Sequence, residues 1–375
     1  MNKFRLLVVG FAAAGLVAAT PVAASAGGSK PAPTPTPVVE STAVVQPFNL
    51  DLSTKKVLVA DGGLGLVGSL ASDGSITPIA TDQPGASGIA VSRDGRRTAF
   101  TTTVIDYSTF TITDSGLNVW GQGGSKLYAD TLAYETAKNP DQSITYGIEN
   151  PSPCVAEALA AAGIPASYTG LVDSHAYSVA ALGRGWVVAD AGANALFTVD
   201  RKGRVKTLAV LPAQPAKITA DAAAELGLPD CVVGVTYAFE AVPTDVEVGR
   251  DGWLYVSTLP GGPESAALGA RGSVYKVNPF TGKAKRVAGG FLGATNLALA
   301  PNGTIYVAEL FGGQISQVRH GRTSTLVSLP GVVAVETSAR GAVWAATMAS
   351  EDPAAPGTIV RVTGGKVYQK GTVWE

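Results

Sequence analysis

The chain has 375 residues, of which 46% are hydrophobic and only 15% are charged, and its net charge at pH 7 is −1. A chain of this composition can bury a large core. It has no basic cluster of the kind that binds nucleic-acid phosphates or anionic membrane surfaces, so we predict no nucleic-acid partner.

The N-terminus is typical of an export signal. Lys3 and Arg5 precede an apolar run over residues 6–19, and Ala24-Ser25-Ala26 is a small-residue cleavage site. Residues 1–26 are therefore predicted to be a signal peptide. The apolar run is shorter than the roughly 20 residues that a membrane-spanning helix needs. We predict a secreted, extracellular or cell-envelope protein with no membrane span.

A repeated strand pattern fills the remainder of the chain. Residues 27–42 are rich in Pro and Thr and are predicted to be a linker. In residues 43–375, pairs of short strands joined by tight polar turns span 48–61, 88–102, 178–190, 245–258, 296–309 and 334–347. Two more strands follow each pair, which predicts an all-β, six-bladed β-propeller of four-stranded blades. The predicted blades are 43–84, 85–174, 175–241, 242–292, 293–331 and 332–375.

Long connections are predicted on one face of this propeller only, which we call the elaborated face; the opposite face is the plain face. The insertions lie at residues 103–124, 144–174, 212–242 and 259–272. Two of them hold a short predicted helix, at residues 158–163 and 219–227, and each of these also holds one of the two cysteines. Since an even cysteine count in an exported protein favours a bridge, we predict a Cys154–Cys231 disulfide that stiffens a cap over the channel mouth.

One position near the mouth of the central channel is predicted to carry ligand-binding side chains. Alignment of the six strand pairs places Phe48, Gly88, Ser178, Asp245, Asn296 and Ala334 there. Propeller hydrolases hold a divalent cation with about four convergent oxygens, but this ring offers only Asp245 and Asn296. Glu247 and Glu336 follow two residues later and are candidates for facing the channel. We predict no cofactor, with a weak structural cation such as calcium, or a catalytic metal, as alternatives.

The second strand of each pair ends in a polar residue on the elaborated face. These residues are Asp61, Thr102, Asp190, Thr258, Glu309 and Thr347. One interpretation is that they accept backbone N–H bonds in the following turn. The other is that Asp61, Asp190 and Glu309 form an acidic rim that binds a cation, an amine or a sugar.

Two further side chains are candidates for ligand binding. His175 lies on the elaborated face, where it could serve in acid–base catalysis or in packing. His320 lies in a short turn of the plain face. Trp120 lies in a polar, glycine-rich insertion, so an indole that stacks on a ligand and one that packs locally are both possible. Trp186, Trp253 and Trp344 recur at the start of second strands and are predicted to pack between blades.

Several stretches resemble a known family. They are PTDVEVGRDGWLYVSTLPGGPE (243–264), GARGSVYKVNPFTG (269–282), GFLGATNLALAPNGTIYVAELFGGQIS (290–316) and CVVGVTYAFEAVPTD (231–245). They look like the ScyD/ScyE family of exported bacterial propeller proteins, which is related to NHL and TolB-like propellers. The resemblance implies a six-bladed propeller and export, and it brings no catalytic residues with it.

The sequence therefore predicts a secreted, non-catalytic binding or scaffold protein that uses its elaborated face. Its partner is an extracellular protein, a glycan or a small molecule. The alternative is a divalent-metal-dependent hydrolase or lactonase of the six-bladed type, whose metal site the sequence leaves incomplete.

Overall fold

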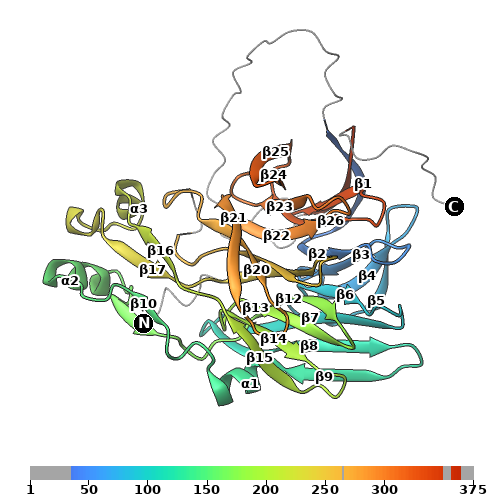
Figure 1. Ribbon diagram of the computed structural model, residues 1–375, viewed down its shortest axis with the longest axis horizontal. Coiled ribbons are helices and arrows are strands. Elements are labelled where there is room, and N and C mark those ends of the chain that lie inside the picture. The colour runs from blue at the N-terminus through green and yellow to red at the C-terminus, as the bar shows by residue number, and fades with distance from the viewer. Residues whose placement is uncertain (1–34, 264–265, 349–355, 365–375) are drawn as a thin grey trace, which may run out of the picture.

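The computed structural model describes residues 35–263, 266–348 and 356–364. Six four-stranded antiparallel sheets surround a common axis as the blades of a β-propeller, as predicted (Figure 1). Blade one consists of β2 (Pro47–Asp51), β3 (Leu58–Asp61), β4 (Leu66–Leu70) and β5 (Ile76–Ala80). Blade two consists of β6 (Ile89–Val91), β7 (Arg97–Asp106), β8 (Thr111–Gly121) and β9 (Lys126–Asp130). Blade three consists of β12 (Ala176–Leu182), β13 (Gly185–Asp190), β14 (Ala195–Val199) and β15 (Val205–Val210). Blade four consists of β18 (Pro243–Val248), β19 (Leu254–Thr258), β20 (Gly272–Val277) and β21 (Ala284–Phe291). Blade five consists of β22 (Ala294–Leu299), β23 (Ile305–Glu309), β24 (Gln314–Arg319) and β25 (Arg322–Ser328). Blade six consists of β26 (Val332–Thr337), β27 (Val343–Thr347), β28 (Gly357–Thr363) and β1 (Thr36–Val44). The predicted signal peptide lies outside the described residues.

The N-terminal strand closes the propeller. β1 pairs antiparallel with β28, with Val39 opposite Val360, and so forms the outer strand of blade six. The linker predicted over 27–42 is therefore wrong from Thr36 onward. Pro37 is tolerated there because the outermost strand of a sheet needs N–H donors on one side only. The fourth strand that the repeat predicts after β28 in blade six falls outside the described residues.

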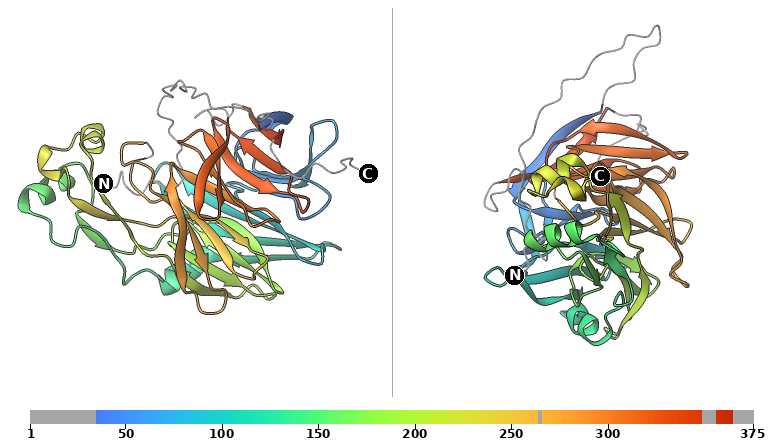
Figure 2. Two further views of the ribbon diagram at one scale, coloured as in Figure 1. Left: turned by 45° about the horizontal axis from the view of Figure 1, so that its top comes forward. Right: turned by 90° about the vertical axis from the view of Figure 1, so that its left-hand side faces the viewer.

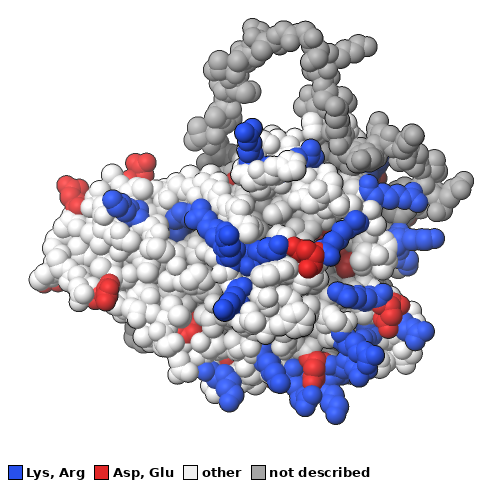
Figure 3. Space-filling view, in the orientation of Figure 1, with Lys and Arg blue, Asp and Glu red and all other residues white. Residues whose placement is uncertain are grey.

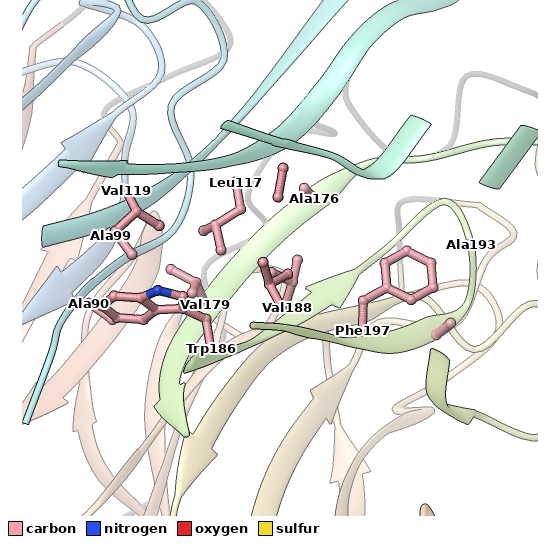
Figure 4. Packing of buried hydrophobic residues seen from close by; sticks show 13 residues of the cluster. Ala90, Ala99, Leu117, Val119, Ala176, Val179, Trp186, Val188, Ala193 and Phe197 are labelled. Atoms are coloured by element: carbon pink, nitrogen blue, oxygen red, sulfur yellow. The ribbon is translucent and has the colours of Figure 1, made fainter. Parts of the chain in front are cut away.

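Apolar faces of adjacent blades pack against each other around the ring. Between blades two and three, Leu117 of β8 meets Trp186 and Phe197 of blade three in one buried cluster (Figure 4). Trp186 is 2% exposed, which confirms its predicted packing role. Each such interface gives a large aromatic or aliphatic side chain a fully buried site, and burial of this kind is the main source of fold stability.

Two insertions join to form a seventh sheet, which the sequence analysis took for loops. β10 (Thr145–Gly147) and β11 (Ser167–Thr169) follow blade two, and β16 (Gln214–Lys217) and β17 (Thr236–Phe239) follow blade three. The four strands form one sheet in the order β11-β10-β17-β16. We call residues 145–169 and 214–239 the arm; it projects from the elaborated face of the propeller (Figure 2).

The arm has its own helices, core and disulfide. The Cys154–Cys231 bridge forms as predicted. It joins α2 (Pro153–Ala161) to the short 3₁₀ helix η1 (Asp230–Val232), which follows α3 (Ala220–Glu225). The hydroxyls of Ser152 and Thr219 cap the two helices. The arm holds one base, Lys217, against the acids Glu149, Glu157, Asp221, Glu225 and Asp230. In Figure 3 the Lys and Arg side chains accordingly gather over the propeller.

Blade two departs from the prediction at both of its ends. The Thr/Ser-rich insertion at 103–124 is a long β7–β8 hairpin in which Arg97 pairs with Gly121 and Asp106 with Thr111. A third helix, α1 (Thr131–Lys138), follows β9 and was not predicted. Asp130 caps it by accepting the N–H of Ala133. No helix among the described residues is long and apolar enough to cross a membrane.

Candidate functional site

The central channel is closed at mid-height by Asp245. One carboxyl oxygen accepts hydrogen bonds from Asn49 Nδ2 (3.3 Å) on blade one and from the hydroxyl of Ser178 on blade three. The other accepts the backbone N–H of Leu297 on blade five at 2.9 Å. This one side chain of blade four thus links three other blades across the axis. Burial raises its pKa to about 6.

Asn296 has a comparable structural role in the same layer. Its Oδ1 accepts the backbone N–H of Val335 on blade six at 2.8 Å. The predicted ring is otherwise correct except at Phe48. The strand pairing shows that Asn49, opposite Ala60, is the residue equivalent to Asp245, opposite Ser257. Asp245 and Asn296 therefore form the floor of the channel, with their side-chain oxygens engaged by protein donors.

The mouth of the channel on the elaborated face is filled by apolar side chains. Tyr177 and Val242 are buried there with Ala191, and Phe48 packs against the group. The Phe48 and Tyr177 ring centroids lie 6.0 Å apart. The cap predicted from the disulfide consequently does not stand over an open mouth.

A large cavity opens on the plain face instead. Its volume is about 1010 Å³, and its walls come from the inner strands and first turns of the blades. Three acids project from these strands, each two residues beyond the floor layer: Asp51, Glu247 and Glu336. The predicted channel-facing positions of Glu247 and Glu336 agree with their place in the cavity wall. Asp51 was missed.

Register explains why Asp51 was missed. With Phe48 aligned to Asp245, Asp51 falls three residues further along and belongs to no ring. With Asn49 in that place, as its pairing with Ala60 requires, Asp51 is equivalent to Glu247 and Glu336. The β2–β3 turn is one residue shorter than the β18–β19 turn, since Asp51 pairs with Leu58 whereas Glu247 pairs with Tyr255, and it contains no glycine that would mark the register. A register error of one residue moves a side chain to the other face of its strand.

Burial raises the pKa of all three carboxyls, and the charge of Asp51 raises the pKa of Glu247 and Glu336 further. Asp51 is held by Ser53 and by the N–H of Val91 (2.8 Å). Burial is the largest cause that raises the pKa of Glu247, and the carboxylates of Glu336 and Asp245 add to it. Burial likewise raises the pKa of Glu336, against a hydrogen bond from the backbone of Thr337.

No protein cation neutralises this group within the described residues. The ion pairs found there are Arg204–Asp200, Lys276–Asp251 and Arg361–Glu40. Arg93 and Arg250 line the cavity at the level of the turns, where both are exposed. The cavity therefore combines apolar walls with an acidic interior, and its rim carries Arg93, Arg250 and Asp251.

The acidic rim predicted on the elaborated face is corrected by the hydrogen bonds. Asp61 accepts the N–H groups of Val45 (2.8 Å), Gln46 (3.0 Å) and Leu64 (3.0 Å). Asp190 accepts those of His175 (2.7 Å) and Ala193 (3.1 Å).

Glu309 has the same role in blade five. It accepts the N–H of Leu292 at 2.6 Å and a bond from Gln314 Nε2 at 3.1 Å. Asp61, Asp190 and Glu309 are 0%, 0% and 3% exposed, so they organise turns and are closed to a ligand.

His175 and Trp120 are also not placed to meet a ligand. His175 is buried against Tyr177, with ring centroids 5.4 Å apart, and burial lowers its pKa to about 4. Trp120 lies in β8 near the turn to β9, on the plain-face side. It packs edge-on against Phe100 (5.4 Å), and Lys126 Nζ lies 3.8 Å from its ring centroid. Trp120 thus has the packing role that the sequence left as the alternative.

Among the described residues, no group of three or more His, Cys, Asp or Glu side chains is arranged to hold a metal ion. The hydrolase alternative therefore stays a prediction. What the cavity supplies for chemistry is a set of carboxyls with raised pKa, and such groups are found at both binding and catalytic sites.

Comparisons with known proteins support the fold. No protein-family model and no curated protein matches the chain. A glucose dehydrogenase structure is 11% identical, with a TM-score of 0.53 over 88% of this chain and 99% of that one. A PQQ-bound aldose sugar dehydrogenase from Streptomyces coelicolor is 12% identical, with a TM-score of 0.50 over 89% and 100%. Virginiamycin B lyase from Staphylococcus aureus is 12% identical, with a TM-score of 0.46 over 84% and 82%. At these identities the likeness concerns the propeller alone, and membership of the ScyD/ScyE family stays a prediction.

Proposed function

We propose that the chain is an exported, non-catalytic binding protein that takes a small organic amine into the cavity of the plain face. Export is supported by the N-terminal leader and by the Cys154–Cys231 bridge, since disulfides persist in oxidising compartments. The carrying observation is the acidic interior made by Asp51, Glu247 and Glu336 in a cavity of about 1010 Å³.

The charge of the cavity favours a cationic group on the ligand. Buried carboxyls without a counter-charge are costly to ionise. An ammonium group that enters between Glu247 and Glu336 would supply the positive counter-charge. No Lys or Arg among the described residues forms an ion pair with these two carboxylates. An ammonium also donates three hydrogen bonds, which matches carboxylates that can only accept.

The walls favour an apolar body attached to that group. Leu50, Ile89, Val179 and Leu299 are apolar residues of the cavity wall. Apolar walls with a few fixed polar groups are the usual composition of small-molecule sites. We therefore expect alkyl amines and diamines to bind more tightly than ammonium ion itself.

A thermal-shift and calorimetric screen tests this function. Putrescine, spermidine and n-butylamine would be compared with glucose and xylose on the mature protein and on a Glu247→Gln, Glu336→Gln double variant. We expect an amine to bind, and the double variant to lose at least tenfold in affinity, as does a buried charge pair that loses one partner. Glu157→Gln on α2 is the matched control, because this Glu is exposed on the arm, and it should bind as the parent does. Binding of a sugar but of no amine, or equal binding by the double variant, would refute the proposal.

A further inference from the structure

A second group of acids lies away from the cavity, where α1 meets blade three and the base of the arm. Thr131 begins α1 fully buried, and its hydroxyl bonds Ser115 O at 3.0 Å and Ser174 Oγ at 2.8 Å. Glu135 follows one turn later on the same face of the helix and is 0% exposed. The buried face of α1 thus carries a carboxyl into the interior of the protein.

Four side-chain oxygens in this region are buried without a hydrogen-bond partner among the described residues. They are Glu135 Oε1, Glu135 Oε2, Asn139 Oδ1 and Asp141 Oδ1. Native proteins satisfy most buried polar atoms, and an exception points to an ion or water that occupies the site. Here four exceptions fall within seven residues of chain.

The remaining polar atoms of the Asn139 and Asp141 side chains form hydrogen bonds with the protein. Asn139 Nδ2 donates to Gly170 O at 2.9 Å, and the N–H of Asn139 donates to Glu135 O at 2.7 Å. The other oxygen of Asp141 accepts bonds from Tyr146 Oη (2.9 Å) and Asn194 Nδ2 (3.1 Å). The unpartnered oxygens of Asn139 and Asp141 are therefore fixed in position.

Negative charge accumulates around Glu135. Burial raises its pKa to about 9, the carboxylates of Asp190, Asp141 and Asp173 add to this, and only the backbone of Asp173 acts in the opposite direction. No Lys or Arg in the described part of the chain forms an ion pair with Glu135 or Asp141. A proton on Glu135 would relieve one oxygen and leave the others unsatisfied.

We propose that Glu135, Asn139 and Asp141 bind a hard divalent cation, of the size and ligand preference of calcium, at the base of the arm. Calcium takes six to eight oxygen ligands from carboxylates, amide and backbone carbonyls and water, in an adaptable geometry. Two carboxylates and one amide provide the four free oxygens, and water or main-chain oxygens complete the shell. This set needs no third acidic ligand, which fits the lack of a three-acid metal cluster among the described residues.

The site would fasten the arm to the propeller. Gly170, which directly follows β11, packs so closely on Asp141 that a Cβ there would lie 2.1 Å from Asp141 Oδ1. Tyr146 on β10 and Asn194 in blade three hold the same carboxylate. A cation at Asp141 therefore stabilises the contact between α1, strands β10 and β11 of the arm, and blade three.

Calcium binding to the mature, chelator-treated protein tests the proposal. We expect equilibrium dialysis to give one Ca²⁺ per chain, and thermal unfolding to move to higher temperature with CaCl₂ and less with MgCl₂. Glu135→Gln and Asp141→Asn should each lower the Ca²⁺ affinity at least tenfold, while Glu157→Gln should leave it unchanged. Less than one-tenth of a Ca²⁺ per chain, with melting curves that CaCl₂ does not shift, would overturn the proposal.

A second variant keeps the test informative if the acid variants do not fold. Asn139 has a φ of 36° in the left-handed region, so Asn139→Gly preserves the backbone and removes only the side chain. We expect it to fold and to bind Ca²⁺ more weakly. If Glu135 is instead a buried neutral acid, Glu135→Gln will match the parent in stability with or without CaCl₂, and the proposal fails.

Discussion

Replacing Asp245 by Ala removes the side chain that joins four blades across the channel. The change leaves the buried donors of Asn49, Ser178 and Leu297 without their acceptor. Each stranded donor costs about 1–3 kcal/mol, and the Ser178 hydroxyl can rotate to another acceptor. We therefore expect a loss of about 2–6 kcal/mol in the free energy of unfolding.

The loss should be larger in acid than in base. Because the pKa of Asp245 is raised in the folded state to about 6 from 3.8, the folded protein gains stability from protonating it, and this gain disappears as pH rises through 6. Between pH 5 and pH 8 the parent loses on the order of 1 kcal/mol from this one group, whereas the Ala variant has nothing to lose. The destabilisation measured at pH 5 should thus exceed that at pH 8 by about this amount.

Urea unfolding followed by tryptophan fluorescence at the two pH values measures both effects. Asn296→Ala is the matched control, since it strands one donor, Val335 N–H, in the same layer and carries no charge. It should cost about 1–3 kcal/mol at both pH values. A destabilisation by Asp245→Ala below 1 kcal/mol, or one that is larger at pH 8, would refute this account of the channel floor.

Three further predictions concern the parts that the propeller holds together. The double variant Cys154→Ser, Cys231→Ser removes a disulfide of sequence separation 77, which contributes about 4–5 kcal/mol in the chain-entropy model. Hydrogen exchange should become faster in β10 and β17 and stay slow in the inner strands of the blades. Equal acceleration in all strands would contradict an independently packed arm. Deletion of residues 1–44 removes β1 and exposes the edge of β28, so size-exclusion chromatography should find aggregates, whereas a monomer with the parent melting temperature would show that β1 is dispensable. Gly85→Ala places a Cβ 2.0 Å from Thr103 O at a φ of +62°; it should cost on the order of 2 kcal/mol or more in chemical denaturation, and a neutral effect would be the contrary result.

The fold was readable from the sequence because a propeller repeats its local pattern. Tight turns such as those after Val91, Val248 and Leu299 recur at the same place in blades two to six, and their positive-φ glycines, for example Gly95 and Gly252, mark them. Helix ends could also be predicted where capping residues occur, as at Thr219 and Gly227. These signals are local and need no knowledge of distant contacts.

The features that were missed depend on pairing between distant segments. β1 pairs with β28 at the far end of the chain, and β10 pairs with β17 across the whole of blade three. Short strands with Pro or few apolar residues, such as Thr145–Gly147, look like loops until their partner is known. Trp120 was misplaced for a related reason, because the long β7–β8 hairpin moved it from an insertion into a strand.

The candidate site was half predicted. Glu247 and Glu336 follow from the repeat. Asp51 does not, because the β2–β3 turn is one residue shorter than the β18–β19 turn and lacks a glycine. The open end of the channel could not be predicted from loop lengths. Long insertions favoured the elaborated face, yet Phe48, Tyr177 and Val242 fill that mouth. Side-chain packing, which sequence patterns do not specify, decided which end of the channel is open.

Proton release during ligand binding is the most direct test of the acidic cavity. Calorimetry of the amine that binds best, at pH 7 in two buffers of different ionisation enthalpy, counts the protons that leave the protein. Since a bound ammonium stabilises ionised carboxylates and lowers the raised pKa values of Glu247 and Glu336, we expect net proton release, absent in the double Gln variant. Binding with no proton exchange, or with proton uptake by the protein, would contradict a site built on these carboxyls.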